Sequence, residues 1–254
     1  MKGVILAGGS GSRLYPLTRI TNKHLLPVYN QPMIYFPIQL LVSAGIDRIL
    51  VVTGGNHAGE FLPLLGNGSA FGLHHIDYTY QEHASGIADA LALARHFADG
   101  DDVCVMLGDN IFEWSLRPFV ERFADQRGGA RVLIAPVEHP EWYGVPVLDG
   151  GRIVRIEEKP ATPMSRFAVT GCYVYDADVF SIVETLEPSE RGELEITDVN
   201  NAYLQRGDLE YDTVEGYWAD CGESFISYLN ANNLVASRGA NKPRATERVA
   251  SPPM

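Results

Sequence analysis

Glycines and a cation follow a short apolar run near the start of the chain. Residues 4–7 read Val-Ile-Leu-Ala, and Gly8, Gly9 and Gly11 come next, just ahead of Arg13. Glycine permits positive φ and lets another group approach the backbone N–H atoms, so a loop of this kind suits a bound phosphate. A tight Gly-Ser turn is the alternative interpretation of the same stretch.

Two known phosphate loops do not fit this stretch. A dinucleotide-binding G-x-G-x-x-G pattern laid on Gly9 and Gly11 meets Leu14 at its third glycine, and no acid follows the expected second strand, which runs into Thr53-Gly54-Gly55. A Walker loop needs glycine directly before Lys-Ser/Thr, whereas Lys23 stands between Asn22 and His24. The function of the loop must therefore be inferred from the rest of the sequence.

Two aspartates stand where a metal could be held. Asp109 follows the apolar run 103–107, and Asp220 lies within the stretch WADCG. In an open α/β sheet, ligands bind beyond the carboxyl ends of the strands, and Mg²⁺ takes one or two carboxylates together with substrate oxygens. The two aspartates could share one metal, although each alone is also compatible with a simple turn.

Two lysines are further candidates for binding an anion. Lys23 lies in NKHLLPV just before an apolar run, and Lys159 lies in IEEKP. Because Lys159 precedes a proline, its backbone is expected to be extended, at the exit of the strand 153–156. A solvated lysine and a salt-bridged sheet edge are the corresponding alternatives.

The composition limits the class of protein. The chain has 254 residues with 46% apolar content, enough for one large core, and we expect a single domain. Its three cysteines, Cys104, Cys172 and Cys221, form no C-x-x-C pair, so we expect neither disulfides nor zinc and favour a reducing cytoplasm. No apolar run approaches the roughly 18 residues of a membrane span, so no membrane partner is expected.

The charge makes the positions of the few cations informative. A formal net charge of −12 argues against a nucleic-acid partner, since such proteins usually carry a basic stripe. An acidic protein that binds a phosphate must concentrate its cations at one place and recruit a divalent metal, because long-range steering works against the substrate.

The periodicity predicts strands that alternate with helices, hence an α/β fold with a largely parallel sheet. The expected strands are 4–7, 49–53, 103–107, 132–137 and 171–175, and the expected helices are 33–44, 87–97, 116–125, 177–186 and 197–206. Pro37 places the start of the first helix just before it. A hairpin, 144–148 and 153–156, is expected as an insertion, and residues 237–254 as a mobile tail after the domain 1–236.

A series of motifs resembles one family. In order and approximate spacing, the chain resembles the bacterial sugar nucleotidylyltransferases, and most of all the branch that joins dTTP to glucose 1-phosphate, through the stretches MKGVILAGGSGSRLYPLT, NKHLLPV, PMIYFPI, LGDNIF, YGV, EEKP, AVTGCYVYD, SERGELEITDVN and WADCG. The resemblance implies an enzyme with a Rossmann-like three-layer nucleotidyltransferase fold. It also implies a mostly parallel central sheet and an inserted β-rich sugar-binding part. We further expect a homo-oligomer.

The same resemblance implies roles for individual residues. The nucleotide would be bound by Leu6, Gly8, Gly9 and Gly11 through their backbone, by Arg13 and Lys23 at the triphosphate, by Gln81 and Gly86 at the base, and by Asp109. The sugar phosphate would be bound by Lys159, with Asn110, Gly144, Glu158 and Val169 lining the sugar pocket. Asp109 and Asp220 would hold Mg²⁺, and Arg13, Lys23, Asp109, Lys159 and Asp220 would be catalytic.

The chain departs from the family in places that leave its substrates open. Relatives read Q-P-S-P-x-G-L-A-Q-A where residues 81–90 read QEHASGIADA, and they commonly have glutamine where this chain has His24. UTP or CTP in place of dTTP, or another hexose 1-phosphate, remains an alternative, as does a non-catalytic nucleotide-sugar sensor. The C-terminal helical extension of longer relatives does not follow residue 254, so feedback control through it is not expected.

Overall fold

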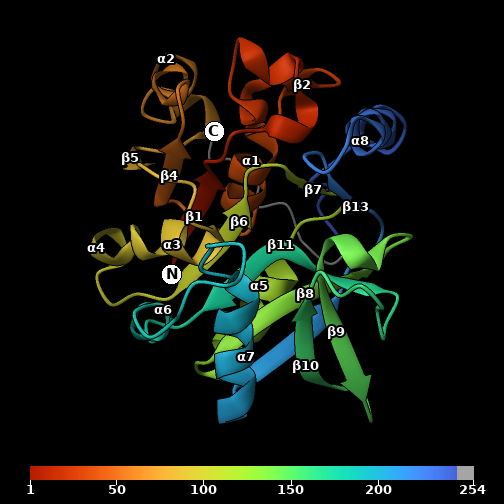
Figure 1. The fold of residues 1–254 in the computed structure, drawn as a ribbon. Coiled ribbons are helices and arrows are strands. Elements are labelled where there is room, and N and C mark those ends of the chain that lie inside the picture. The colour runs from red at the N-terminus through yellow and green to blue at the C-terminus, as the bar shows by residue number, and fades with distance from the viewer. Residues whose placement is uncertain (245–254) are drawn as a thin grey trace.

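A seven-stranded sheet forms the centre of the computed structural model, which describes residues 1–244 (Figure 1). Its strand order is β12-β8-β11-β6-β1-β4-β5. The strands are β1 (Lys2–Ala7), β4 (Ile49–Gly54), β5 (Ile76–Gln81), β6 (Val103–Leu107), β8 (Ala130–Pro136), β11 (Phe167–Tyr175) and β12 (Leu209–Thr213). Only β11 runs against its neighbours, β6 and β8, so the expected mostly parallel sheet is confirmed.

Helices cover both faces of this sheet. One face carries α1 (Tyr35–Ser43), α2 (Phe61–Leu65) and α5 (Arg117–Gln126), and the other carries α3 (Ile87–Ala92), α4 (Arg95–Ala98), α6 (Val179–Val183) and α7 (Ile196–Arg206). In β1, Val4 and Leu6 pack into one core and Ile5 and Ala7 into the other. A strand buried on both faces must be apolar throughout, which explains the unbroken run that the sequence shows there.

A third apolar cluster lies beside the sheet and holds the last helix, α8 (Phe225–Arg238). Here Ala231 and Val235 of α8 pack with residues of the N-terminal segment, among them Leu14 and Met33. Short elements complete the described chain: β2 (Pro27–Val28), β3 (Gln31–Pro32), β7 (Asn110–Phe112), β13 (Trp218–Asp220), and 3-10 turns at Ser12–Leu14, Leu17–Arg19, Lys23–Leu25, Ala58–Glu60, Ser69–Phe71 and Pro140–Trp142. Within residues 1–244, no helix combines the length and apolarity that crossing a membrane requires.

The expected hairpin is present as a separate two-stranded sheet, β9 (Gly144–Asp149) with β10 (Arg152–Glu158). Gly150 and Gly151 both have positive φ, 55° and 79°, which a tight turn between right-twisted strands requires. The side chain of Asn201 in α7 holds β10 by two hydrogen bonds to the backbone of Ile156, of 3.0 and 2.9 Å. The hairpin is therefore fixed to the helical layer.

Several helices differ from the periodicity-based expectation. The first begins at Tyr35, two residues before Pro37, as expected. The expected helix 87–97 is instead two helices, because the Ala94 N–H bonds to the Leu91 carbonyl rather than to the carbonyl one residue further back, which interrupts the α-helical hydrogen bonding there. The expected helix 177–186 shortens to α6. The sequence analysis did not find α8 or the strands β5, β7, β12 and β13.

The beginning of the expected tail belongs to the fold. The helix α8 continues to Arg238, and the backbone N–H groups of Asn241 and Lys242 bond to Phe112 and Glu113 at 3.0 and 2.9 Å. Lys242 also forms an ion pair of 2.7 Å with the buried Glu113 carboxylate. The boundary expected at residue 237 therefore lies too early. Residues 245–254, the rest of that tail, lie outside the described part of the chain.

The burial of β1 leads to a stability prediction. Replacing the fully buried Ile5 by Ala leaves a cavity between β1 and the α1 layer, and we expect a loss of about 2–5 kcal/mol in the free energy of unfolding. Ile20→Ala is the matched control, because Ile20 is 79% exposed and its loss should change stability by less than about 0.5 kcal/mol. Urea unfolding measures both, and equal midpoints for the two variants would contradict this packing.

Candidate active site

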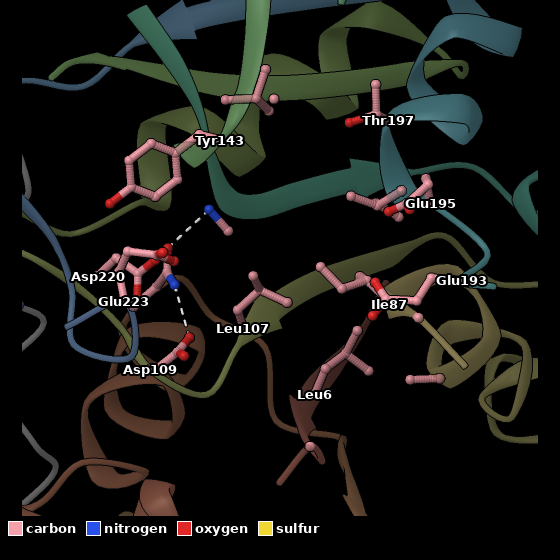
Figure 2. A pocket seen from close by; sticks show the side chains of 18 of the residues that line it. Leu6, Ile87, Leu107, Asp109, Tyr143, Glu193, Glu195, Thr197, Asp220 and Glu223 are labelled. Carbon is pink, nitrogen blue, oxygen red and sulfur yellow. Dashed lines mark hydrogen bonds between the residues drawn. The ribbon is translucent and has the colours of Figure 1, made fainter. Parts of the chain in front are cut away.

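A cavity of about 330 Å³ opens at the carboxyl ends of the central strands, between the sheet and the β9/β10 hairpin (Figure 2). It brings together the expected site residues Leu6, Gly8, Gly9, Arg13, Lys23, Gln81, Gly86, Asp109, Asn110, Gly144, Glu158, Lys159, Val169 and Asp220. Leu6 and Leu107, at the ends of β1 and β6, form an apolar floor between two groups of polar side chains. Ligands of open α/β sheets bind at this edge.

Gly11 is the one expected residue that does not line the cavity. Its φ is +60°, and a Cβ there would lie 2.8 Å from Cγ2 of Thr18 and 3.1 Å from Cβ of Lys23. Thr18 also donates a 2.9 Å hydrogen bond to the Gly11 carbonyl. Gly11 thus shapes the loop from behind by letting the following segment fold against it, while Gly8 and Gly9 face the cavity.

The two aspartates meet through a strand pairing between distant parts of the chain. The strand β13 pairs antiparallel with β7 and sets Asp220 opposite Asn110, the neighbour of Asp109. The N–H of Cys221 donates to the Asp109 carbonyl at 2.9 Å. Gly222 is needed here, because a Cβ would lie 2.8 Å from Nζ of Lys23 and closer still to the Asp109 carboxylate.

A lysine shares this site with the two carboxylates. Nζ of Lys23 lies 2.5 Å from Oδ2 of Asp109, and both side chains are largely buried. Burial acts to lower the pKa of Lys23, but the adjacent Asp109 carboxylate outweighs it and raises this pKa. Burial acts to raise the pKa of Asp109, yet Lys23 holds it well below its usual range. Within residues 1–244 Asp220 forms no ion pair, and burial together with the Asp109 charge raises its pKa.

Asn110 fixes the orientation of Asp109. Its amide nitrogen donates to Oδ1 of Asp109 at 3.0 Å, and its oxygen accepts from Nε1 of Trp218 at 2.6 Å and from the Gly171 N–H at 2.9 Å. A Cβ on Gly171 would lie 2.6 Å from that oxygen, so glycine is required for this approach. The carboxylate is therefore held from three separate segments.

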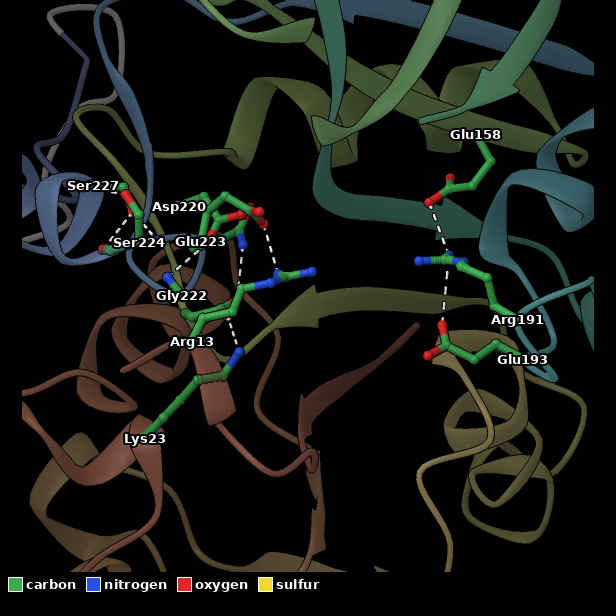
Figure 3. A network of polar contacts seen from close by, with 12 residues as sticks. Arg13, Lys23, Glu158, Arg191, Glu193, Asp220, Gly222, Glu223, Ser224 and Ser227 are labelled. Carbon is green, nitrogen blue, oxygen red and sulfur yellow. Dashed lines mark hydrogen bonds and ion pairs between the residues drawn. The ribbon is translucent and has the colours of Figure 1, made fainter. Parts of the chain in front are cut away.

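Arg13 is paired with a carboxylate that the sequence analysis missed. Its Nη1 lies 2.7 Å from Oε2 of Glu223, and Arg13 itself is 53% exposed (Figure 3). Burial raises the pKa of Glu223. A reciprocal pair of bonds between Ser224 and Ser227 starts α8 directly after Glu223. No local pattern marks Glu223, because its partner is 210 positions away in the sequence.

A second missed group lies across the cavity, in the segment SERGELEITDVN. Thr197 donates to Oε2 of Glu158 at 2.5 Å, and the Arg191 guanidinium lies 3.2 Å from Oε1 of the same carboxylate. Arg191 also pairs with Glu195 at 2.7 Å. Its contact with Glu193, of 3.5 Å, is drawn in Figure 3. Both oxygens of Glu158 are thus held in place at the cavity wall. The segment carries part of the family resemblance, but no local pattern marks Arg191 or Thr197 as partners of Glu158, because the two residues lie 33 and 39 positions away from it.

Two further residues of the cavity are His24, whose protonation state the surroundings set, and Lys159, whose backbone conformation is unusual. Burial and the nearby Lys23 lower the pKa of His24 to about 3, so its ring is neutral near pH 7. Its Nδ1 lies 2.8 Å from Oδ1 of Asn22, an acceptor, so Nδ1 carries the proton. Lys159 directly follows β10, as expected, but the extended backbone expected before Pro160 is wrong: its φ is +43°, in the left-handed region. Its N–H bonds to the Tyr143 carbonyl at 3.0 Å, which turns the chain away from the strand direction.

The chain belongs to the nucleotidyl transferase family, whose model matches residues 2–238. It is 46% identical to a glucose-1-phosphate thymidylyltransferase of Actinoplanes sp., over 87% of this chain and 74% of that protein. It is 43% identical to one of Mycolicibacterium smegmatis, over 98% of this chain and 88% of that protein. The fold and the family together define an enzyme of the nucleotidyltransferase class.

Solved structures agree with this assignment. A Bacillus anthracis chain assigned to glucose-1-phosphate thymidylyltransferase, and solved with sucrose, superposes with a TM-score of 0.89 at 49% identity, covering 93% of this chain and 96% of that one. A UDP-glucose pyrophosphorylase solved with UDP-glucose superposes with a TM-score of 0.80 at 23% identity, which speaks for the fold alone. The Rossmann-like α/β fold expected from the sequence is confirmed.

Proposed function

We propose that this chain is a Mg²⁺-dependent glucose-1-phosphate thymidylyltransferase, which transfers dTMP from dTTP to α-D-glucose 1-phosphate and releases pyrophosphate. The observation that carries the proposal is one cavity with cations on two sides, Arg13 and Lys23 from the N-terminal segment and Lys159 from the hairpin. Relatives with this name, at 43–46% identity over most of the chain, support the same substrates.

The proposed reaction explains why cations rather than a general base are gathered here. A sugar 1-phosphate is already an oxyanion, so it can attack the α-phosphorus of a nucleoside triphosphate without losing a proton. The obstacle is repulsion between two anions, which positioned cations reduce while they stabilise the charge that gathers on the leaving pyrophosphate. Lys159 is assigned to the sugar phosphate, and Arg13 and Lys23 to the triphosphate.

Asp109 and Asp220 are assigned to the metal. In residues 1–244, no group of three or more His, Cys, Asp or Glu side chains could hold a metal ion, so two carboxylates would act together with phosphate oxygens. This donor set fits Mg²⁺, which takes few protein ligands and keeps substrate oxygens. Bound there, Mg²⁺ would neutralise charge on the phosphates. Lys23 keeps Asp109 ionised, and Asn110 keeps it aimed into the cavity.

The hairpin side of the cavity is assigned to the sugar. Glu158 has both oxygens fixed by Thr197 and Arg191, and each oxygen retains lone pairs for sugar hydroxyls. A Cβ on Gly144 would lie 3.1 Å from Oγ1 of Thr197 and 3.6 Å from Oε2 of Glu158. The glycine therefore leaves room beside the carboxylate, and Val169 supplies an apolar wall.

The same proposal bears on the partners of the enzyme and on its cellular compartment. The substrates are small anions, and the net charge of −12 argues against a nucleic-acid partner. The three cysteines are free and buried, which suits a reducing cytoplasm. The homo-oligomer remains a prediction, for which the exposed Phe225, Ile226 and Leu229 of α8 offer apolar surface.

A substrate panel tests the proposed function. Pyrophosphate release is measured with each of dTTP, UTP, dCTP and dATP against glucose 1-phosphate, galactose 1-phosphate and mannose 1-phosphate, with Mg²⁺ present. We expect the highest kcat/KM for dTTP with glucose 1-phosphate. A purine nucleotide as the best donor, or binding of nucleotide-sugars without any turnover, would contradict the proposal and favour a different transferase or a sensor.

The metal assignment predicts that replacing either aspartate lowers kcat to a similar extent. Asp109→Asn and Asp220→Asn should each lower kcat by about 100-fold or more, since an amide cannot replace a carboxylate on Mg²⁺ and metal stabilisation is worth several kcal/mol. Chelation should abolish the activity of the unmodified enzyme, and added Mg²⁺ should restore it. Asp99→Asn, an exposed change at the end of α4, is the control. Near-normal kcat in either site variant would rule out the shared metal.

The two groups of cations predict opposite losses of affinity. Lys159→Ala should weaken glucose 1-phosphate binding about 10- to 100-fold, since a charge-assisted hydrogen bond contributes roughly 1.5–3 kcal/mol, while dTTP binding stays nearly unchanged. Arg13→Ala should weaken dTTP binding instead. Calorimetry with one ligand at a time measures both, with Arg152→Ala, exposed on the same hairpin, as control. The reverse pattern would mean that the two assignments are exchanged.

A further inference from the structure

The side-chain amide of Gln81 has a fixed orientation. Gln81 ends β5, is 8% exposed, and lines the cavity. Its Nε2 donates to Oδ2 of Asp89 at 2.7 Å and to the Gly86 carbonyl at 3.2 Å. A carboxylate and a carbonyl only accept hydrogen bonds, so the NH₂ must face them and the amide oxygen must point the other way.

The amide oxygen of Gln81 lies on the cavity side. A Cβ built on Gly8 would lie 3.0 Å from this oxygen, and Gly8 belongs to the loop that lines the cavity. Within residues 1–244, Oε1 receives no hydrogen bond, whereas both protons of the NH₂ have acceptors. Gln81 thus offers the cavity an acceptor and withholds its donor.

Asp89 is the residue that enforces this orientation. It stands at the third position of α3, after Gly86, whose φ of +106° and close approach to Leu194 allow only glycine. The first turn of α3 therefore places the Asp89 carboxylate next to the amide nitrogen of Gln81. Donation to an anion also polarises the amide and makes its oxygen a stronger acceptor.

We propose that Asp89 is a positioning residue which holds the Gln81 amide with its oxygen toward the base, so that the site selects thymine and uracil over cytosine. The proposal rests on the proposed function, in which Gln81 meets the base of the nucleotide. It adds a residue, and a direction of hydrogen bonding, that excludes CTP as the preferred donor.

The hydrogen-bonding groups of the bases explain why thymine and uracil are favoured over cytosine. Thymine and uracil carry a proton on N3 and can donate it to the Gln81 oxygen. Cytosine has a lone pair at N3, which the same oxygen repels, and it can reach that oxygen only through its 4-amino group, after shifting in the site. A well-placed hydrogen-bonding pair discriminates between bases by about 1–3 kcal/mol, which corresponds to roughly 5- to 150-fold.

The test compares dUTP with dCTP, which share the deoxyribose and triphosphate and both lack the 5-methyl group. The wild-type enzyme should favour dUTP by at least about 10-fold in kcat/KM. Asp89→Asn and Asp89→Ser can either donate or accept, so each removes the shorter, charged contact and leaves only the 3.2 Å bond to the Gly86 carbonyl to orient the Gln81 amide. The ratio should then fall at least about fivefold through KM. Glu82→Gln removes the same charge from an exposed neighbour and should leave the ratio unchanged.

The outcomes separate this inference from the proposed function. Equal use of dUTP and dCTP by the wild-type enzyme, or an unchanged ratio in a folded Asp89 variant, would overturn the role of Asp89. Failure to release pyrophosphate from any pyrimidine nucleotide would overturn the proposed function instead. In that case the relative affinities for dUTP and dCTP, measured by calorimetry, decide the inference alone. If Asp89→Asn does not fold, Asp89→Ser with the same two ligands decides it.

Discussion

The contact between Lys23 and Asp109 ties together two parts of the site that lie 86 positions apart in the sequence. Separately, a buried ammonium and a buried carboxylate would each be costly, and each would tend toward its neutral form. Together, at 2.5 Å, they keep the charged forms at the end of β6. Asp220 lies close to the Asp109 charge and, in the described part of the chain, forms no ion pair. Burial and that charge raise its pKa, so it would gain most from a divalent ion.

The position of that ion pair depends on the sheet. The strands β1 and β6 are neighbours and run parallel, so the loops that follow them, with Lys23 after one and Asp109 after the other, emerge at the same edge. The pairing of β13 with β7 then brings Asp220 from near the end of the chain. The hairpin forms the opposite wall and is held by α7 through Asn201. The positions of the charged side chains thus depend on the packing of the sheet, of the β7/β13 pair and of the hairpin.

The sequence predicted what local patterns encode. Strands buried on both faces, such as β1 and β6, appear as unbroken apolar runs, and the hairpin is marked by its Gly150-Gly151 turn. The helix α8 was missed because Phe225, Ile226 and Leu229 are apolar but exposed, which obscures the helical period. The resemblance named fewer than half of the residues that line the cavity, although every residue it named except Gly11 lies there. It could not show that Glu223 pairs with Arg13 or that Thr197 and Arg191 hold Glu158, because these contacts join residues far apart in the sequence.

The pairing of Arg13 with Glu223 affects how strongly a phosphate would be attracted to this position. Arg13 already has an anionic partner, so a phosphate that bound there, as proposed, would exchange one counter-ion for another rather than capture a free cation. The net attraction is then the difference between two similar contacts, and it is smaller than either. When the phosphate leaves, Glu223 can take its place again, and the cation is never left without a partner. In the proposed reaction, this counter-ion exchange would limit how tightly the site retains pyrophosphate, the product that must depart before the next turnover.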